Sequence, residues 1–290
     1  MKPGSFEYFR PQSVGEAVAL LAECGDDTSI LAGGQSLVPL LNMRLARPEK
    51  LMDVNRVGGL DAIEVSASSV RVGGLVRAAV LEHHAEAAAA MPVLSQAISH
   101  IGHPQIRNRT TIGGNIAHAD PSSELPGVLA CLDGEVELTS LAGTRTVGWS
   151  DFFVTVFTTS RESNELVTGV RFPRPAGWDF HFTEMARRHG DFPLVALTVG
   201  LQREGDQLTG VRVAATGVSD RPLRLTGVEQ AAYGRPLNTA VIAELTALAA
   251  AECDPRADGA GGAEYRRHLL GTLLRRTLTN QLGRNAPAAA

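Results

Sequence analysis

The sequence has little cysteine. Its 290 residues include three, Cys24, Cys131 and Cys253, which stand far apart and form no C-x-x-C pair. Five histidines lie nearer to one another, without a ligand spacing that we recognise: His83, His84, His100, His103 and His118. Zinc and iron–sulfur sites are usually held by closely spaced ligands. We therefore expect ordinary thiols and no metal centre on this chain.

An excess of charge and a long apolar run are also missing. The net charge is −4 with a pI of about 6.1, and no lysine and arginine cluster is interleaved with aromatics, which make up 5% of the chain. This argues against a nucleic-acid partner. No apolar stretch approaches the roughly 20 residues of a membrane span. The opening MKPGSFEYFRPQS lacks the apolar core of a secretory signal. We expect a cytoplasmic protein without a membrane span.

Three catalytic or nucleotide-binding motifs are absent as well. The sequence contains neither G-x-G-x-x-G nor G-x-x-x-x-G-K-[ST], which argues against a Rossmann dinucleotide site and a nucleoside triphosphatase. It has no G-x-S-x-G, so a nucleophile elbow is not expected.

What the sequence does have is the composition of a globular protein, 44% hydrophobic and 20% charged. Residues 1–56 predict a helix begun by a capping box at Ser13, and then strands at 28–32 and 51–55 around a short helix capped by Ser36. This pattern predicts a small β-α-β-like unit.

The rest of the chain has a different pattern of expected elements, with hairpins and longer helices. Residues 57–175 predict a hairpin at 62–76, two helices within 80–102 that break at Met91-Pro92, a hairpin at 135–148 and a strand at 165–173. Residues 176–290 follow a Pro/Gly linker at 173–178 and predict an antiparallel meander at 194–218 and helices at 239–252 and 263–282.

Two glycine pairs give the first indication of function. Gly33-Gly34 in ILAGGQSL separates an expected strand from an expected helix, and Gly113-Gly114 in RTTIGGNIAH repeats the pattern after an Ile-type strand end. Glycine lets the backbone approach a ligand and turn successive N–H groups toward an anion. Two converging loops would suit a diphosphate, although each pair alone is also explained as a tight turn.

Polar residues near the second pair support this interpretation. Thr110 and Thr111 could add hydroxyl donors, and Glu124 could accept hydrogen bonds from ribose hydroxyls.

Three stretches taken together carry a resemblance. AGGQSLVPLLNMRLARPEKLMDVN, IGHPQIRNRTTIGGNIAHADPSSELP and ARRHGDFPLVAL resemble the FAD-binding medium subunit of the molybdenum hydroxylases, the family that contains carbon monoxide dehydrogenase and xanthine dehydrogenase. The resemblance runs from the N-terminus to about Gly200. It implies an α+β chain with a vanillyl-alcohol-oxidase (PCMH)-type FAD-binding domain of two α/β subdomains, residues 1–56 and 57–175. A C-terminal antiparallel sheet-and-helix domain, residues 176–290, would follow.

The resemblance also implies which residues hold the cofactor. The two Gly-Gly loops would bind the diphosphate of a non-covalent FAD, with N–H groups from residues 32–37 on one side and 111–115 on the other. The residues assigned in this way are Ala32, Gly33, Gly34, Gln35, Ser36, Leu37, Ile101, Gly102, Thr110, Thr111, Gly113, Gly114, Asn115, Ala117, Ser123, Glu124, Asp191 and Phe192. Ser123 and Glu124 are expected on the ribose or adenine side, and Asp191 with Phe192 near the isoalloxazine ring. No catalytic residue or metal ligand is implied.

Two positions depart from the family pattern. Many members have Asp where this chain has His103, and Lys where it has Glu184. Loss of a cation near the flavin would disfavour the reduced, anionic flavin. A Glu184→Lys variant is therefore expected to shift the flavin midpoint potential.

The implied function is electron transfer. Molybdopterin in a large subunit would hydroxylate the substrate, [2Fe-2S] clusters in a small subunit would relay electrons, and FAD on this chain would pass them to an external acceptor. A dimer of heterotrimers is the usual assembly in this family, and overall likeness favours an N-heterocycle or an aldehyde as substrate. Two alternatives stay open: an assembly subunit without flavin, and a free-standing flavin oxidase or reductase using Asp191, His189 or Tyr233 for proton transfer.

Overall fold

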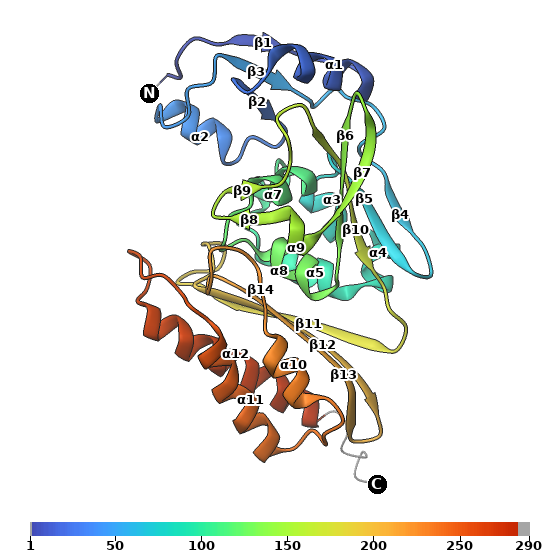
Figure 1. Cartoon of the computed structure of the whole chain (residues 1–290), viewed down its shortest axis with the longest axis vertical. Helices are drawn as coiled ribbons and strands as arrows, with labels where there is room; N and C mark the ends of the chain where they lie inside the picture. The colour runs from blue at the N-terminus through green and yellow to red at the C-terminus, as the bar shows by residue number, and fades with distance from the viewer. Residues whose placement is uncertain (1, 284–290) are drawn as a thin grey trace.

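The computed structural model describes residues 2–283. Three sheets follow one another along the longest axis of the molecule, from the N-terminal sheet at one end to the C-terminal helices at the other (Figure 1). The N-terminal sheet is parallel, in the order β1-β3-β2. Its elements are β1 (Glu7–Phe9), α1 (Val14–Cys24), β2 (Thr28–Leu31), α2 (Leu37–Asn42) and β3 (Lys50–Asp53).

Of the two serines expected to cap helices in this segment, only Ser13 forms a capping hydrogen bond. Ser13 caps α1, because its hydroxyl accepts a hydrogen bond from the Glu16 N–H at 3.1 Å. The Glu16 carboxylate reaches the N–H of Gln12 at 2.6 Å, one residue before the position that a capping box predicts. Ser36 stands at the start of α2, but its hydroxyl makes no capping hydrogen bond, so the predicted cap is wrong.

The middle sheet is antiparallel, in the order β4-β5-β10-β6-β7. Both hairpins and the strand that ends at Pro173 form as expected. Residues 78–100 form three helices where two are expected, because His84 starts a separate helix by accepting the Ala87 N–H on its Nδ1. The strands are β4 (Ile63–Val65), β5 (Ser69–Gly73), β6 (Glu135–Ser140), β7 (Gly143–Gly148) and β10 (Leu166–Pro173), with a small pair β8 (Phe153–Thr155) and β9 (Thr158–Thr159).

The helices of this middle part pack against one face of its sheet and against the C-terminal sheet. Their apolar side chains form a core with the inward residues of β5, β6 and β10. They are α3 (Ala78–Glu82), α4 (Ala85–Ala90), α5 (Pro92–His100), α6 (Pro104–Arg107), α7 (Ile112–His118), α8 (Glu124–Cys131) and α9 (Trp149–Phe152).

The C-terminal sheet has the order β11-β12-β13-β14 and lies between α5 and α8 on one side and three helices on the other (Figure 1). The meander at 194–218 is confirmed as β12 and β13, which pair antiparallel. The first strand and the first of the three helices were not expected. The elements are β11 (Trp178–Met185), β12 (Val195–Glu204), β13 (Gln207–Thr216), β14 (Leu223–Arg224), α10 (Thr226–Ala232), α11 (Thr239–Glu252) and α12 (Ala263–Gly283).

Each of the three larger sheets has an apolar core, and the N-terminal core also includes Leu60 and Leu166 of the middle part. A small cluster of Ala130, Cys131 and Ala214 lies between the middle and C-terminal parts. The boundaries predicted near residues 56 and 175 stay predictions, and residues 284–290 of the last predicted segment lie outside the described part of the chain. Within residues 2–283, no helix combines the length and apolar character that a membrane crossing requires.

Candidate cofactor-binding site

A cleft lies where β2, the start of α2, the segment around α6 and α7, and β10 approach one another. Its volume is about 560 Å³, within the range of small-molecule sites. Every residue that the sequence predicts at the cofactor lines this one cleft: Ala32, Gly33, Gly34, Gln35, Ser36, Leu37, Ile101, Gly102, Thr110, Thr111, Gly113, Gly114, Asn115, Ala117, Ser123, Glu124, Asp191 and Phe192. The structure thus brings together residues that are far apart in the sequence.

The first glycine loop offers a row of free donors. Among the described residues, none accepts a hydrogen bond from the backbone N–H groups of residues 33–37. Gly34 has a φ of +72°, a conformation that side chains other than glycine rarely adopt. Unpaired N–H groups are costly when buried, and an anionic ligand in the cleft would satisfy them.

The second glycine pair is expected to follow a strand, but the structure has no strand directly before it. Gly113 and Gly114 lie in the first turn of α7, where the Thr111 hydroxyl caps the helix by accepting the Gly114 N–H at 3.1 Å. The N–H groups of residues 112–115 are all used within the chain, by Val76 O, Gly74 O, Thr111 Oγ1 and Thr111 O. This side of the cleft therefore offers hydroxyl and amide groups more than free N–H groups.

Glycines let the backbone segments of the cleft approach closely. A Cβ on Gly33 would lie 2.5 Å from the carbonyl oxygen of Arg109, and a Cβ on Gly113 would lie 2.7 Å from that of Gly74. Contacts this short do not occur for real Cβ atoms. Gly33 and Gly113 are thus required for the packing of the two loops, whatever their role toward a ligand.

A buried carboxyl forms part of the inner wall. Glu124 begins α8 and is 4% exposed. Burial, helped by the nearby charges of Glu184 and Asp120, raises the pKa of this carboxyl to about 8. Glu124 is then a neutral acid at pH 7, able to donate a hydrogen bond into the cleft. Beside it, Ser123 and Asn115 hydrogen bond to each other, with the Asn115 Nδ2 at 2.9 Å from the Ser123 hydroxyl.

The two positions that depart from the family pattern lie behind the cleft wall and do not line it. The Glu184 carboxylate lies 3.1 Å from His100 Nδ1, and its other oxygen is buried without a partner. The His103 ring packs under Gly190, where a Cβ would lie 2.6 Å from its Cε1. Either residue therefore acts on a ligand only through the wall.

One cation at the cleft was not predicted from the sequence. Arg161, in the segment between β9 and β10, is the one lysine or arginine among the described residues that lines the cleft. Its Nη1 donates to the carbonyls of Glu162 and Glu165, each at 2.8 Å, and burial lowers its pKa. Its Nε and Nη2 donate to no described residue. A single arginine outside any motif gave no signal of this role.

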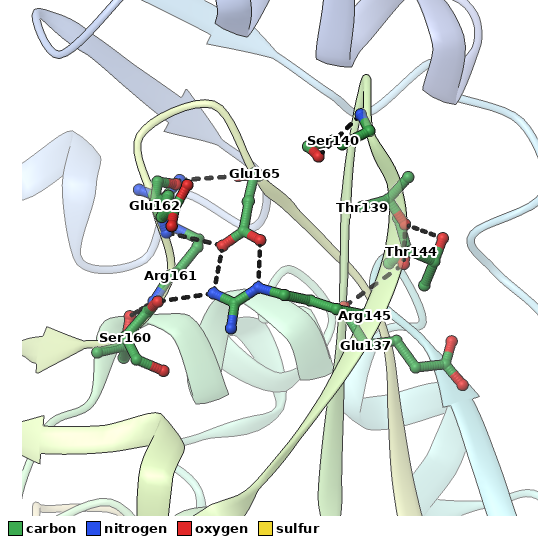
Figure 2. Close-up of polar contacts among 12 residues, drawn as sticks. Glu137, Thr139, Ser140, Thr144, Arg145, Ser160, Arg161, Glu162 and Glu165 are labelled. Atoms are coloured by element: carbon green, nitrogen blue, oxygen red, sulfur yellow. Dashed lines mark hydrogen bonds and ion pairs between the residues drawn. The ribbon is translucent and has the colours of Figure 1, made fainter.

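An ion pair between Arg145 and Glu165 holds the segment that carries Arg161 (Figure 2). Arg145, on β7, donates to the Glu165 carboxylate from Nε at 2.6 Å and from Nη2 at 2.8 Å. The same carboxylate accepts the Glu162 N–H at 2.8 Å, which closes the turn that carries Arg161. Other residues missed by the sequence analysis supply apolar or polar wall: Thr28, Ser29, Ile30, Leu40, Val54, Leu60, Gly74, Leu75, Ile106, His118, Asp120, Leu166, Val167 and Gly190.

The residues present fit FAD. A diphosphate needs several donors and benefits from a cation. The cleft supplies free N–H groups at residues 33–37, the hydroxyls of Thr110 and Thr111 and the guanidinium of Arg161. Aliphatic side chains such as Leu60 and Leu166 supply apolar wall for flat rings. Of the residues considered for proton transfer, Asp191 lines the cleft, whereas His189 and Tyr233 do not.

Comparisons with known proteins indicate the same cofactor. Residues 4–175 match the FAD binding domain in molybdopterin dehydrogenase, and residues 180–281 match the CO dehydrogenase flavoprotein C-terminal domain. The chain is 40% identical to the 6-hydroxypseudooxynicotine dehydrogenase complex subunit alpha of Paenarthrobacter nicotinovorans, covering 99% of this chain and 98% of that protein. It is 36% identical to the carbon monoxide dehydrogenase medium chain of Afipia carboxidovorans, over 96% of this chain and 97% of that one.

A solved structure shows the same architecture. A chain of carbon monoxide dehydrogenase from Hydrogenophaga pseudoflava superposes with a TM-score of 0.94 at 35% identity, covering 99% of this chain and 100% of that chain. Sequence and fold therefore agree over both matched domains. The chain belongs to the family of FAD-binding medium subunits of the molybdenum hydroxylases.

Proposed function

We propose that this chain holds FAD non-covalently in the cleft and serves as the electron-transfer subunit of a molybdenum hydroxylase complex. Bound FAD supplies two-electron storage and transfer, which protein side chains do not provide. The observation that carries the proposal is the convergence of all the predicted cofactor residues on one cleft with free N–H donors. The roles of the single residues below are part of the proposal.

The diphosphate is assigned to the glycine loops. The N–H groups of residues 33–37 bind phosphate oxygens from one side, and the Thr110 and Thr111 hydroxyls bind from the other. Arg161 adds a positive charge that no described carboxylate neutralises by a direct side-chain hydrogen bond. Because the guanidinium is largely desolvated, its attraction for an anion is stronger than it would be in water.

The ring end of the cofactor is assigned to the wall formed by Ile101, Gly102 and the loop from Gly190 to Phe192. Phe192 is 68% exposed in the free chain, so a flat ring system has an aromatic face available for stacking. The protonated Glu124 carboxyl is placed to hold a hydrogen bond to the cofactor. The chain thus binds and orients the flavin and excludes water.

The assembly is inferred from the family. We infer that iron–sulfur clusters on a small subunit deliver electrons after hydroxylation at the molybdenum of a large subunit, and that three kinds of chain form a dimer of heterotrimers. The external acceptor is left open, and a cytoplasmic location stays a prediction. The likeness to a 6-hydroxypseudooxynicotine dehydrogenase subunit over the whole chain favours an N-heterocycle over an aldehyde as the complex's substrate.

The test is the cofactor content of the native complex. The chain is isolated gently from its host, FAD, molybdenum and iron are measured per polypeptide, and the co-purifying chains are counted. We expect nearly one FAD per chain, together with molybdenum, iron and two further chains. FAD with a single chain would instead favour a free-standing flavoenzyme, and molybdenum, iron and two further chains without FAD would favour an assembly subunit without flavin.

A further inference from the structure

The two glycine loops are tied together by side chains that do not line the cleft. We propose that Asn55 and Arg77 form a clamp that sets the spacing of the loops and thereby positions their donors for the cofactor diphosphate. This inference rests on the proposed function. It assigns positioning roles to two residues that are not among those predicted to hold the cofactor and that do not line the cleft.

Asn55 holds the first loop. Its Nδ2 donates to the carbonyl of Ala32 at 2.9 Å and lies 3.4 Å from that of Leu31. The Asn55 side chain is itself fixed, because its N–H and Nδ2 both donate to Asp53 Oδ1, at 2.9 and 2.6 Å. The other oxygen of Asp53 accepts the Tyr8 hydroxyl at 2.6 Å. The end of β2 is thus held by a fully paired network that starts on β1.

Arg77 joins this network to the second loop. Its Nη2 donates to Asn55 Oδ1 at 2.6 Å, and its Nη1 donates to the carbonyl of Arg109 at 2.7 Å. The guanidinium group therefore bridges the Asn55 amide, two residues after β3, and the backbone that leads into α7. The backbone beside Arg77 adds to the connection, since the Ala78 N–H donates to the Thr110 carbonyl at 2.9 Å.

The clamp acts where the two loops touch. The Arg109 carbonyl that Arg77 grips is the atom that a Cβ on Gly33 would strike. The glycine permits the approach, and the guanidinium supplies the attraction that holds it. The apolar core of the N-terminal part also includes Leu60 and Leu166 of the middle part. The clamp adds a polar connection at the point where the two loops meet.

A lysine does not replace this arginine. The fork delivers two donors at a fixed angle to two acceptors, whereas an ammonium is a single compact centre. The charge environment of Arg77 includes the carboxylate of Asp53 and the guanidinium of Arg109. The Arg109 guanidinium repels the charge of Arg77 and the Asp53 carboxylate attracts it, so these two effects oppose each other. We therefore attribute the contacts of Arg77 with Asn55 and the Arg109 carbonyl to the geometry of its guanidinium group.

The experiment uses the full chain with Arg77→Met, Arg77→Lys, Asn55→Ala and the double variant Asn55→Ala/Arg77→Met. The matched control is Arg71→Met, which removes a fork of similar geometry from Glu137 in the middle sheet (Nε at 2.8 Å, Nη2 at 2.6 Å), away from the loops. FAD dissociation constants are measured by flavin fluorescence, and hydrogen exchange is measured without FAD over residues 30–37 and 107–115.

We expect Arg77→Met and Asn55→Ala each to weaken FAD binding by about tenfold or more and to speed exchange in both loops without speeding it in β12 and β13. Arg77→Lys should fall between these and the unaltered chain. The double variant should weaken binding little more than either single variant, because each breaks the same connection. Arg71→Met should leave the FAD dissociation constant within about twofold.

Two results overturn the clamp. One is an Arg77→Met chain that binds FAD as tightly as the control. The other is faster exchange spread over the whole chain, which would indicate a structural role only. If the unaltered chain binds no FAD, the proposed function fails, and local loop exchange in the variants still tests the clamp on its own.

Discussion

At the scale of single residues, adjacent glycines have different reasons to be there. Gly34 needs glycine for its φ of +72°, whereas Gly33 needs it because any side chain would strike the Arg109 carbonyl. Gly114 has ordinary helical backbone, and its missing Cβ leaves room for the Thr111 hydroxyl that caps α7. A Gly-Gly pattern in a sequence does not distinguish these causes, because each depends on atoms far away in the chain.

Replacement of Gly33 by alanine should push the loops apart. We expect Gly33→Ala to lower the free energy of unfolding by about 1–3 kcal/mol through overpacking and to weaken FAD binding. Gly15→Ala is the control: it lies inside α1 with no atom within 4 Å of the added Cβ, and it should stabilise the chain by about 0.5–1 kcal/mol. Denaturant unfolding and FAD titration distinguish the two, and equal behaviour would contradict the close-approach explanation.

Arg161, the one lysine or arginine within residues 2–283 that lines the cleft, gives a salt-dependent prediction. Arg161→Gln should raise the FAD dissociation constant by roughly tenfold, since a hydrogen bond to a charged group is worth about 1.5–3 kcal/mol. The loss should shrink as salt screens the remaining attraction. Arg174→Gln changes the same charge at an exposed position outside the cleft and serves as control. Identical FAD affinities for the two variants would remove Arg161 from the site.

Glu124 gives a pH dependence with a definite sign. Its pKa rises from an ordinary 4.5 to about 8 on folding, so its neutral form favours the folded chain at low pH and this contribution is lost as pH rises from 4.5 toward 8. Each unit of pKa difference corresponds to about 1.4 kcal/mol. In the chain without FAD, Glu124→Gln should flatten the fall of unfolding free energy over this range. An unchanged pH profile would show that the carboxyl is ionised when buried.

At the scale of secondary-structure elements, hairpins with a local sequence pattern were predicted, whereas a strand that joins its sheet next to a later strand was missed. The hairpins at 62–76 and 135–148 and the meander at 194–218 were predictable from alternating apolar residues and turn glycines. The strand β11 was missed, although WDFHFTEM alternates, with Trp178, Phe180 and Phe182 on one face and Asp179 and His181 on the other. It pairs with β12 and packs on α5 and α12, contacts that the sequence alone does not show.

The two serines that precede helices make a matched pair. Ser13→Ala removes a formed cap and should lower the free energy of unfolding by about 1 kcal/mol. Ser36→Ala removes no capping hydrogen bond and should leave the stability of the FAD-free chain within about 0.5 kcal/mol. Both are measured by chemical denaturation. A loss at Ser36 equal to that at Ser13 would mean that its hydroxyl does cap α2 in solution.

At the scale of the whole molecule, the sequence motifs located the cleft but not what holds it together. The predicted cofactor residues fall in ordered motifs that can be recognised along the chain, and all of them line one cleft. Arg161 and Arg77 belong to no such motif, and the motif that ends at Asn55 does not reveal the role of this residue. These roles arise only when segments far apart in sequence meet. The ion pairs that join the middle and C-terminal parts, such as Arg224 with Asp133 at 2.6 Å, also join residues far apart in the sequence and could not be predicted from it.

The layout of the cleft also has a consequence for the order of events during synthesis. Its first wall comes from a sheet that is complete at Asp53, whereas its last wall, Gly190 to Phe192, leads into β12 of the C-terminal sheet. A ribosome making this chain therefore releases the first half of the binding site well before the second. Under the proposed function, capture of the flavin then waits until residues 190–192 and the sheet into which they lead have been made.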